Sequence, residues 1–252
     1  MEDIINSLIK IADADLKSAK LLYENKSYYN SLFLFQQAME KSYKATGLLI
    51  GQLDLIGLRL VGHDYIKLLK KTVKDGFAGT QHYLDSTFYK MIAEDIDITT
   101  NEIEATMSSV KRDIFFDLTD EALVFFVKLI DNQQDYITHT FETIVESPDF
   151  FRKLQDAGQL TQDDIDSLKT SNFQSVEEKT AMLTFSKHLI TFNILGLITS
   201  PHSEQTRYPF LNNGSVSCPT EIYTMDMPII KHQMKLMLIA EASINYFRNH
   251  DM

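Results

Sequence analysis

A group of five polar side chains lies within a mostly apolar stretch between residues 28 and 50, and these side chains could do chemistry. Glu40 and Lys44 are four residues apart, a spacing that allows an ion pair along one face of a helix. Two interpretations are open: a solvated stripe with one such pair, or the wall of a polar cleft in which Lys41 or Lys44 meets a phosphate. The five residues are Gln36, Gln37, Glu40, Lys41 and Lys44.

Three further residues have side chains suited to ligand binding or proton transfer. His63 would begin a short helix, where an imidazole could make a structural hydrogen bond or move a proton. Arg207 and Tyr208 lie in a proline-containing segment. An arginine there could grip a phosphate or carboxylate with its planar guanidinium, or it could clamp the segment onto neighbouring helices. These residues complete the set of candidate ligand contacts, and no catalytic residue is assigned.

Other kinds of site are not predicted. The single cysteine, Cys218, cannot form an internal disulfide and has no histidine or aspartate at a motif-like spacing. The histidines form no H-x3-H pair, and no E-x-x-H pair occurs either. Phosphate-binding glycine motifs are also missing from the sequence. We therefore expect no metal and no cofactor.

The chain of 252 residues contains nine Gly and five Pro, about half of their average usage, so long elements are expected. Apolar residues recur three and four positions apart, which predicts an all-α fold. Residues 200–227 hold three of the prolines and are expected to form a long loop. The last helix is apolar over most of its circumference, which predicts a central or partner-binding helix. The expected helices cover residues 2–25, 28–50, 63–74, 120–146, 149–157, 175–199 and 228–248.

The net charge of −11 is unevenly distributed. Residues 75–180 carry 22 acidic and 8 basic side chains, whereas residues 1–74 and 181–252 have net charges of +3 and 0. The total disfavours a broad nucleic-acid-binding surface but permits a small phosphate site. The acidic segment is either a solvated surface or an inserted module. Its Phe125-Phe126 pair predicts core packing, with a protein-binding face as the alternative.

The location expected from these features is the cytoplasm. The first residues, Met-Glu-Asp-Ile, are acidic where a signal peptide would be basic. The most apolar window, residues 182–198, is short for a membrane span and contains Lys187 and His188. One cysteine suits a reducing compartment. Contact with a membrane is not expected.

Several segments together resemble a known family. Residues 28–45 read Y-Y-N-S-L-F-L-F-Q-Q-A-M-E-K-S-Y-K-A, and A-D-L-K-S-A-K-L-L-Y-E-N-K-S precedes them. G-H-D-Y-I-K-L-L follows at residues 62–69, and T-R-Y-P stands at 206–209. This pattern resembles the HEPN domain, a helical module named for nucleotide binding in higher eukaryotes and prokaryotes. The resemblance implies an antiparallel helical bundle formed by residues 1–74 and 181–252, with residues 75–180 as an acidic helical insertion packed on it.

The resemblance also implies a function and a partner. Many family members are metal-independent ribonucleases that use an arginine and a histidine with four to six residues between them, and they are usually dimers. Other members lack this motif and serve as binding modules. Here no arginine has a histidine at that spacing, and Arg207 is followed by Asn212, Asn213 and Gly214 in the corresponding region. Whether the chain is an enzyme is therefore left open.

Three functions follow as hypotheses. The first is a non-catalytic, homodimeric module that binds a nucleotide, RNA or a protein partner. The second is a ribonuclease with a rearranged site, in which Arg207 acts with His63 or His202. The third is a helical interaction module whose acidic segment, residues 75–180, binds a basic protein partner.

Overall fold

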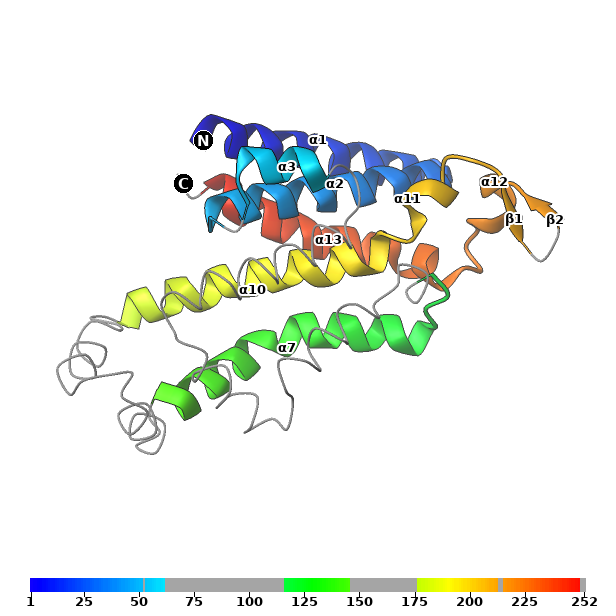
Figure 1. The fold of residues 1–252 in the computed structure, drawn as a ribbon. Coiled ribbons are helices and arrows are strands. Elements are labelled where there is room, and N and C mark those ends of the chain that lie inside the picture. The colour runs from blue at the N-terminus through cyan, green and yellow to red at the C-terminus, as the bar shows by residue number, and fades with distance from the viewer. Residues whose placement is uncertain (52, 62–115, 146–175, 213–214, 250–252) are drawn as a thin grey trace, which may run out of the picture. The chain divides into compact units, whose positions relative to one another are not determined.

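The computed structural model describes residues 1–51, 53–61, 116–145, 176–212 and 215–249, and these carry eight helices and one small hairpin (Figure 1). The all-α fold predicted from the sequence is confirmed. Helices and strands, in chain order, are α1 Glu2–Glu24, α2 Tyr28–Leu49, α3 Leu55–Val61, α7 Asp120–Val145, α10 Val176–Thr199, α11 His202–Gln205, β1 Phe210–Asn212, β2 Ser215–Ser217, α12 Pro219–Ile222 and α13 Pro228–Asn249.

The chain divides into two compact units. One comprises Met1–Thr72, Val110–Ile130 and His188–Met252, and the other comprises Val73–Ser109 and Asp131–Lys187. Helices α7 and α10 each contribute residues to both units. The proposed bundle of residues 1–74 and 181–252 with an insertion at 75–180 stays a prediction.

Helices α1 and α2 form an antiparallel hairpin whose connection is set by local hydrogen bonds. After α1, Lys26 adopts a φ of 61° in the left-handed region. The Lys26 N–H donates to the Tyr23 carbonyl and the Ser27 N–H to the Leu22 carbonyl, a pattern that closes a helix end. The apolar stripe of α1 then faces the core. Its buried residues are Ile5, Ile9, Ala12, Leu16 and Ala19.

Helices α2 and α13 carry much of the core. Both bury apolar side chains such as Phe35 and Met39 of α2 and Leu236 and Met237 of α13. A polar link also crosses this core. Gln233 of α13 donates through Nε2 to Ser31 Oγ at 2.7 Å, and Ser31 Oγ donates to the Ala19 carbonyl of α1 at 2.7 Å. The predicted central position of the last helix agrees with its nine buried residues, which are Ile229, Ile230, Gln233, Leu236, Met237, Ala240, Ser243, Ile244 and Phe247.

The end of α2 leads directly into a helix that the sequence pattern did not predict. Gly51 has a φ of 73°, as expected of a glycine that closes a helix. The Leu53 N–H donates to the Gly47 carbonyl at 2.9 Å. Asp54 Oδ1 accepts from the Gly57 N–H and so caps α3. The predicted helices at 63–74 and 149–157 lie outside the described residues.

The prediction of a long loop over residues 200–227 is wrong. That segment contains α11, the antiparallel pair β1–β2 and α12. Strand β1 pairs with β2 in a register that aligns Phe210 with Ser217 and Asn212 with Ser215. Strands of three residues are too short to show an alternating pattern, and Pro219 begins α12 at a position where proline favours helix entry.

Candidate functional site

The polar row of α2, defined as Gln36, Gln37, Glu40, Lys41 and Lys44, lies largely inside the protein. Gln36, Glu40 and Lys44 are buried, so the solvated stripe is the wrong interpretation for these three. Lys44 Nζ donates to Glu40 Oε1 at 2.6 Å, and Gln36 Nε2 donates to Glu40 Oε2 at 3.3 Å. Burial in a medium of low polarity strengthens such a pair and makes each charge depend on the other.

The row continues toward α1 through its two less buried members. Gln37 Nε2 donates to Gln36 Oε1 at 2.7 Å, and Lys41 Nζ lies 3.3 Å from Gln37 Oε1. Lys41 Nζ also forms an ion pair with Asp15 Oδ2 of α1 at 2.7 Å. Each lysine of the row therefore has a carboxylate partner, and the row together with Asp15 has no net charge. A neutral network of this kind offers little attraction for a phosphate.

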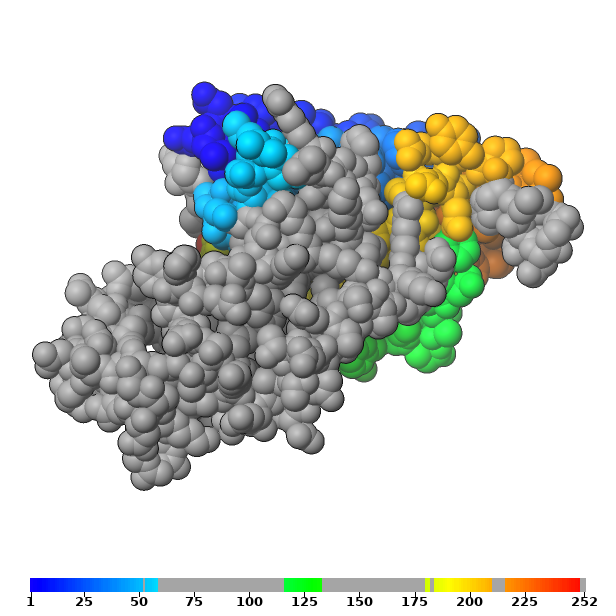
Figure 2. All heavy atoms as spheres, viewed as in Figure 1, coloured from blue at the N-terminus to red at the C-terminus, as the bar shows by residue number. Residues whose placement is uncertain are grey.

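Arg207 is held differently. Its Nε donates to the Ser203 carbonyl of α11 at 2.9 Å, and its guanidinium carbon lies 5.1 Å from the centre of the Phe33 ring of α2. Tyr208 stands beside it, with its ring centre 5.7 Å from the same carbon. Both residues are exposed, and no carboxylate among the described residues pairs with Arg207. The segment that contains α11, in amber, reaches the surface in Figure 2.

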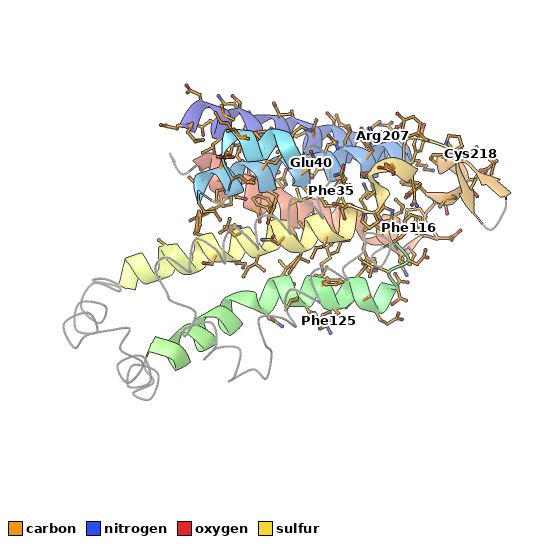
Figure 3. All side chains as sticks on the ribbon, in the orientation of Figure 1. Phe35, Glu40, Phe116, Phe125, Arg207 and Cys218 are labelled. Carbon is orange, nitrogen blue, oxygen red and sulfur yellow. The ribbon has the colours of Figure 1, made fainter. Side chains whose placement is uncertain are left out.

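Arg207 and the polar row do not form one cluster. Phe33 and Glu40 are seven residues apart on α2, which is about 10 Å along the helix axis. Figure 3 labels Arg207 and Glu40 at separate places along α2. The structure thus brings Arg207, Tyr208 and Phe33 together near the start of α2, while Glu40, Lys41 and Lys44 lie further along it. His63 lies outside the described residues.

His202, the other histidine considered as a partner of Arg207, is buried. Its Nδ1 lies 3.1 Å from the hydroxyl oxygen of Tyr223, and its ring centre lies 5.0 Å from that of Phe116. Burial raises the pKa of the Tyr223 hydroxyl. An imidazole enclosed in this way is suited to fixing α11 against its neighbours. It is poorly placed to exchange protons with an RNA strand in solution.

The α2 helix and its polar row belong to a segment with a known family signature. Residues 5–85 match the family model of the HEPN domain. The predicted resemblance is confirmed over these residues. The HEPN match includes the described helices α1, α2 and α3 except for the first residues of α1, whereas Arg207 and Tyr208 lie beyond it. Neither the curated proteins nor the solved structures compared with the chain gave a match.

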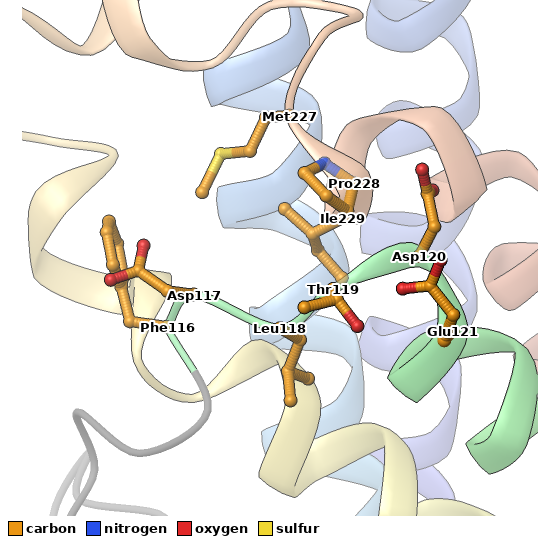
Figure 4. Close-up of a pocket in the computed structure, with 9 residues that line it drawn as sticks. All are labelled: Phe116, Asp117, Leu118, Thr119, Asp120, Glu121, Met227, Pro228 and Ile229. Carbon is orange, nitrogen blue, oxygen red and sulfur yellow. The ribbon is translucent and has the colours of Figure 1, made fainter.

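A pocket of about 360 Å³, which the sequence analysis missed, lies between the starts of α7 and α13 (Figure 4). Asp120 accepts from Lys231 Nζ at 2.9 Å and lies 2.9 Å from His232 Nε2. The Lys231 hydrogen bond holds the pKa of the Asp120 carboxyl below its usual value. Thr119 Oγ1 accepts from the Ala122 N–H and so caps the start of α7. A threonine at this position is a helix-start signal that the sequence contains. The lining residues are Phe116, Asp117, Leu118, Thr119, Asp120, Glu121, Met227, Pro228 and Ile229.

Three carboxylates on this pocket make it a poor site for a phosphate. These carboxylates belong to Asp117, Asp120 and Glu121. The pKa of Glu121 is lowered chiefly by a hydrogen bond from its own backbone N–H at the helix start, which favours the charged carboxylate. Within the described ranges, no three His, Cys, Asp or Glu side chains are grouped so that they could hold a metal ion. The helices of that same part of the chain also include none with the length and apolar character to cross a membrane.

Proposed function

We propose that the chain is a non-catalytic HEPN-like module that binds a nucleotide or RNA, acting as a homodimer in the cytoplasm. The ligand would contact the Arg207 surface, defined as Phe33, Arg207 and Tyr208. The observation that carries this proposal is the state of Arg207. Its exposed guanidinium is oriented by Ser203 and Phe33, and its charge has no carboxylate partner among the described residues.

The chemistry of the Arg207 surface suits a nucleotide. Because Nε already donates to the Ser203 carbonyl, the two terminal amino groups of Arg207 are the donors available to a phosphate. The exposed ring of Tyr208 could stack with an unpaired base next to that phosphate. This combination favours single-stranded RNA or a nucleotide over a duplex, whose bases are already stacked.

The polar row of α2 has a supporting role in this proposal. Lys41 and Lys44 are paired with Asp15 and Glu40, so their charges are compensated before any ligand arrives. Glu40 and Lys44 would hold α2 in the bundle, and α2 in turn presents Phe33 beneath Arg207. They would therefore act on binding through the fold and not by touching the ligand.

Two observations support binding without cleavage. No arginine in the sequence has a histidine at the spacing that the family's ribonucleases use. His202, five residues before Arg207, is buried beside Tyr223. The remaining ribonuclease hypothesis would need Arg207 to act with His63. A cleavage assay on the RNA used to measure binding tests it.

The test is fluorescence anisotropy with a labelled single-stranded RNA in metal-free buffer. We expect Arg207→Ala to weaken binding about tenfold or more, since a charge-assisted, two-pronged contact is lost. Tyr208→Ala should weaken it by a smaller factor. Arg248→Ala is the matched control, because Arg248 is also an exposed arginine but is paired with Asp13 at 3.0 Å. Its affinity should stay near that of the unaltered protein.

Two outcomes would contradict the proposal. Equal affinities for Arg207→Ala and the unaltered protein would remove Arg207 from the site. RNA fragments that appear on a denaturing gel with the unaltered protein, and disappear with Arg207→Ala, would instead support the ribonuclease hypothesis.

A further inference from the structure

The first part of α7 has one buried face and one exposed apolar face within the first unit. Leu123, Val127 and Ile130 are buried. On the opposite face, Phe125 is 60% exposed and Val124 and Leu129 are each 40% exposed. Core packing was the expected role of Phe125, and that prediction is wrong. Figure 3 labels Phe125 on α7, and Figure 2 shows the described part of α7, in green, at the surface.

Two opposite charges flank this apolar face symmetrically. Glu121 precedes Val124 by three residues, and Lys128 follows Phe125 by three. At 100° per residue, all four side chains fall on one face of the helix. Glu121 and Lys128 are both exposed, and neither forms an ion pair with another of the described residues.

This arrangement is complementary to itself. If two copies of α7 lie antiparallel about a two-fold axis that passes between positions 124 and 125, position 121 faces 128 and position 124 faces 125. Glu121 of each copy then meets Lys128 of the other, while Val124 and Phe125 form an apolar centre between the two ion pairs. An isologous interface has this property, because the same patch serves both subunits.

We propose that the α7 face, defined as Glu121, Val124, Phe125, Lys128 and Leu129, is the interface at which two copies of this chain associate. This inference rests on the proposed dimeric module and names the surface that the sequence could not. Helix α7 lies outside the residues that match the HEPN family. The charge pattern selects a second copy as the occupant, because a purely basic partner would leave Lys128 facing a like charge.

The size of the face sets the expected strength. Stable dimers commonly bury about 800 Å² on each partner, and three turns of one helix supply only the centre of such an interface. An aromatic side chain surrounded by smaller apolar groups is a typical energetic centre. We therefore expect association in the micromolar range, with Phe125 contributing most.

Sedimentation velocity over a wide range of concentrations tests the interface. The full chain should form dimers as concentration rises, and Phe125→Asp should weaken association about tenfold or more. Leu238→Asp is the control, since Leu238 is 54% exposed on α13 and lies outside the α7 face. It should associate like the unaltered protein. Circular dichroism and thermal unfolding establish that both variants are folded.

Charge reversal provides a second and independent measurement. Glu121→Lys and Lys128→Glu should each weaken association because like charges then face each other across the axis. The double variant should restore it to within about threefold of the unaltered protein, because the pairs are re-formed with exchanged signs. A double variant that associates no better than the single variants would overturn the proposed geometry.

The outcomes separate this inference from the proposed function. A dimer that is insensitive to Phe125→Asp uses another surface, which overturns the α7 interface but keeps the dimeric module. A chain that stays monomeric at all concentrations overturns both the interface and the dimer. RNA binding at the Arg207 surface is measured by anisotropy, so its success or failure is independent of either result.

Discussion

The polar row of α2 and the Arg207 surface both contain cationic side chains, but these differ in burial and in pairing with carboxylates. Lys44 is buried and lies 2.6 Å from Glu40, whereas Arg207 is exposed and rests on Phe33 without a carboxylate partner among the described residues. Both were candidate ligand contacts in the sequence. The comparison teaches that residue type selects candidates, but burial and charge compensation separate a structural cation from one that can bind a ligand.

The strongest test of this comparison is Glu40→Ala. It removes the carboxylate at 2.6 Å from Lys44 in a pair whose side chains are only 3% and 10% exposed. Breaking such a pair from one side costs about 3–5 kcal/mol, because the buried ammonium of Lys44 loses this carboxylate. Urea denaturation followed by circular dichroism measures the loss. RNA affinity should be retained under conditions where the variant is still folded.

Asp15→Ala is the matched control for Glu40→Ala. It removes the carboxylate of the Lys41 pair, in which both side chains are about one-fifth exposed. Ion pairs accessible to water contribute roughly 0.2–1 kcal/mol, so the loss of stability should be much smaller. Equal losses for the two variants would contradict the structural role assigned to the buried half of the row.

A second test concerns the polar link between α1, α2 and α13. Ser31→Ala leaves the buried Gln233 amide without its acceptor and removes the side-chain donor to the Ala19 carbonyl. Unsatisfied buried groups cost about 1–3 kcal/mol. Gln233→Met should cost less, because Ser31 can still donate to Ala19 and because Gln233 Oε1 has no hydrogen bond among the described residues. Thermal unfolding of the two variants should therefore rank Ser31→Ala as the less stable protein.

The positions of the long helices could be read from the sequence because their signals are local. Predicted helices over 28–50, 120–146 and 228–248 correspond to α2, α7 and α13 with ends that differ by at most one residue. Apolar periodicity, Pro228 at a helix start and Gly51 after a helix end are properties of neighbouring residues. The two three-residue strands carry too few positions for such a signal.

The burial of polar residues could not be read in the same way. Gln36, Glu40 and Lys44 have the composition of a solvated face, and only the tertiary arrangement places them inside. The exposed ring of Phe125 is the reverse case. A helical period separates the faces of a helix, but it does not determine which face other elements cover. Candidate sites from sequence alone are uncertain for this physical reason.

Arg207→Ala should have a small effect on stability and thereby complete the comparison with Glu40→Ala. The guanidinium over Phe33 is exposed, and a cation–aromatic contact at such a position contributes about 0.5–1 kcal/mol. The same urea denaturation measures it. If the free energy of unfolding fell by as much as in Glu40→Ala, Arg207 would be a structural clamp and the proposed ligand contact would lose its basis.

The smallest expected effect is the pH dependence of Asp120, which is paired like Glu40 but has a side chain that is 40% exposed. The Lys231 hydrogen bond lowers the pKa of Asp120 in the folded protein. A lowered pKa means that the carboxylate stabilises the fold above its unfolded-state pKa of about 4, and that this contribution is lost as the pH falls through the folded-state value.

The variant that isolates this effect is Asp120→Asn, which removes the charge at the start of α7. The unaltered protein should have the higher midpoint of thermal unfolding near pH 7, and the difference between the two should shrink as the pH falls below about 4. Asp226→Asn, a change at an exposed aspartate for which the described residues show no ion pair, is the control and should produce no such difference. If the difference in unfolding midpoint between Asp120→Asn and the unaltered protein stayed constant with pH, the charge of Asp120 would contribute nothing to stability. Solvent exposure would then cancel the benefit of the ion pair.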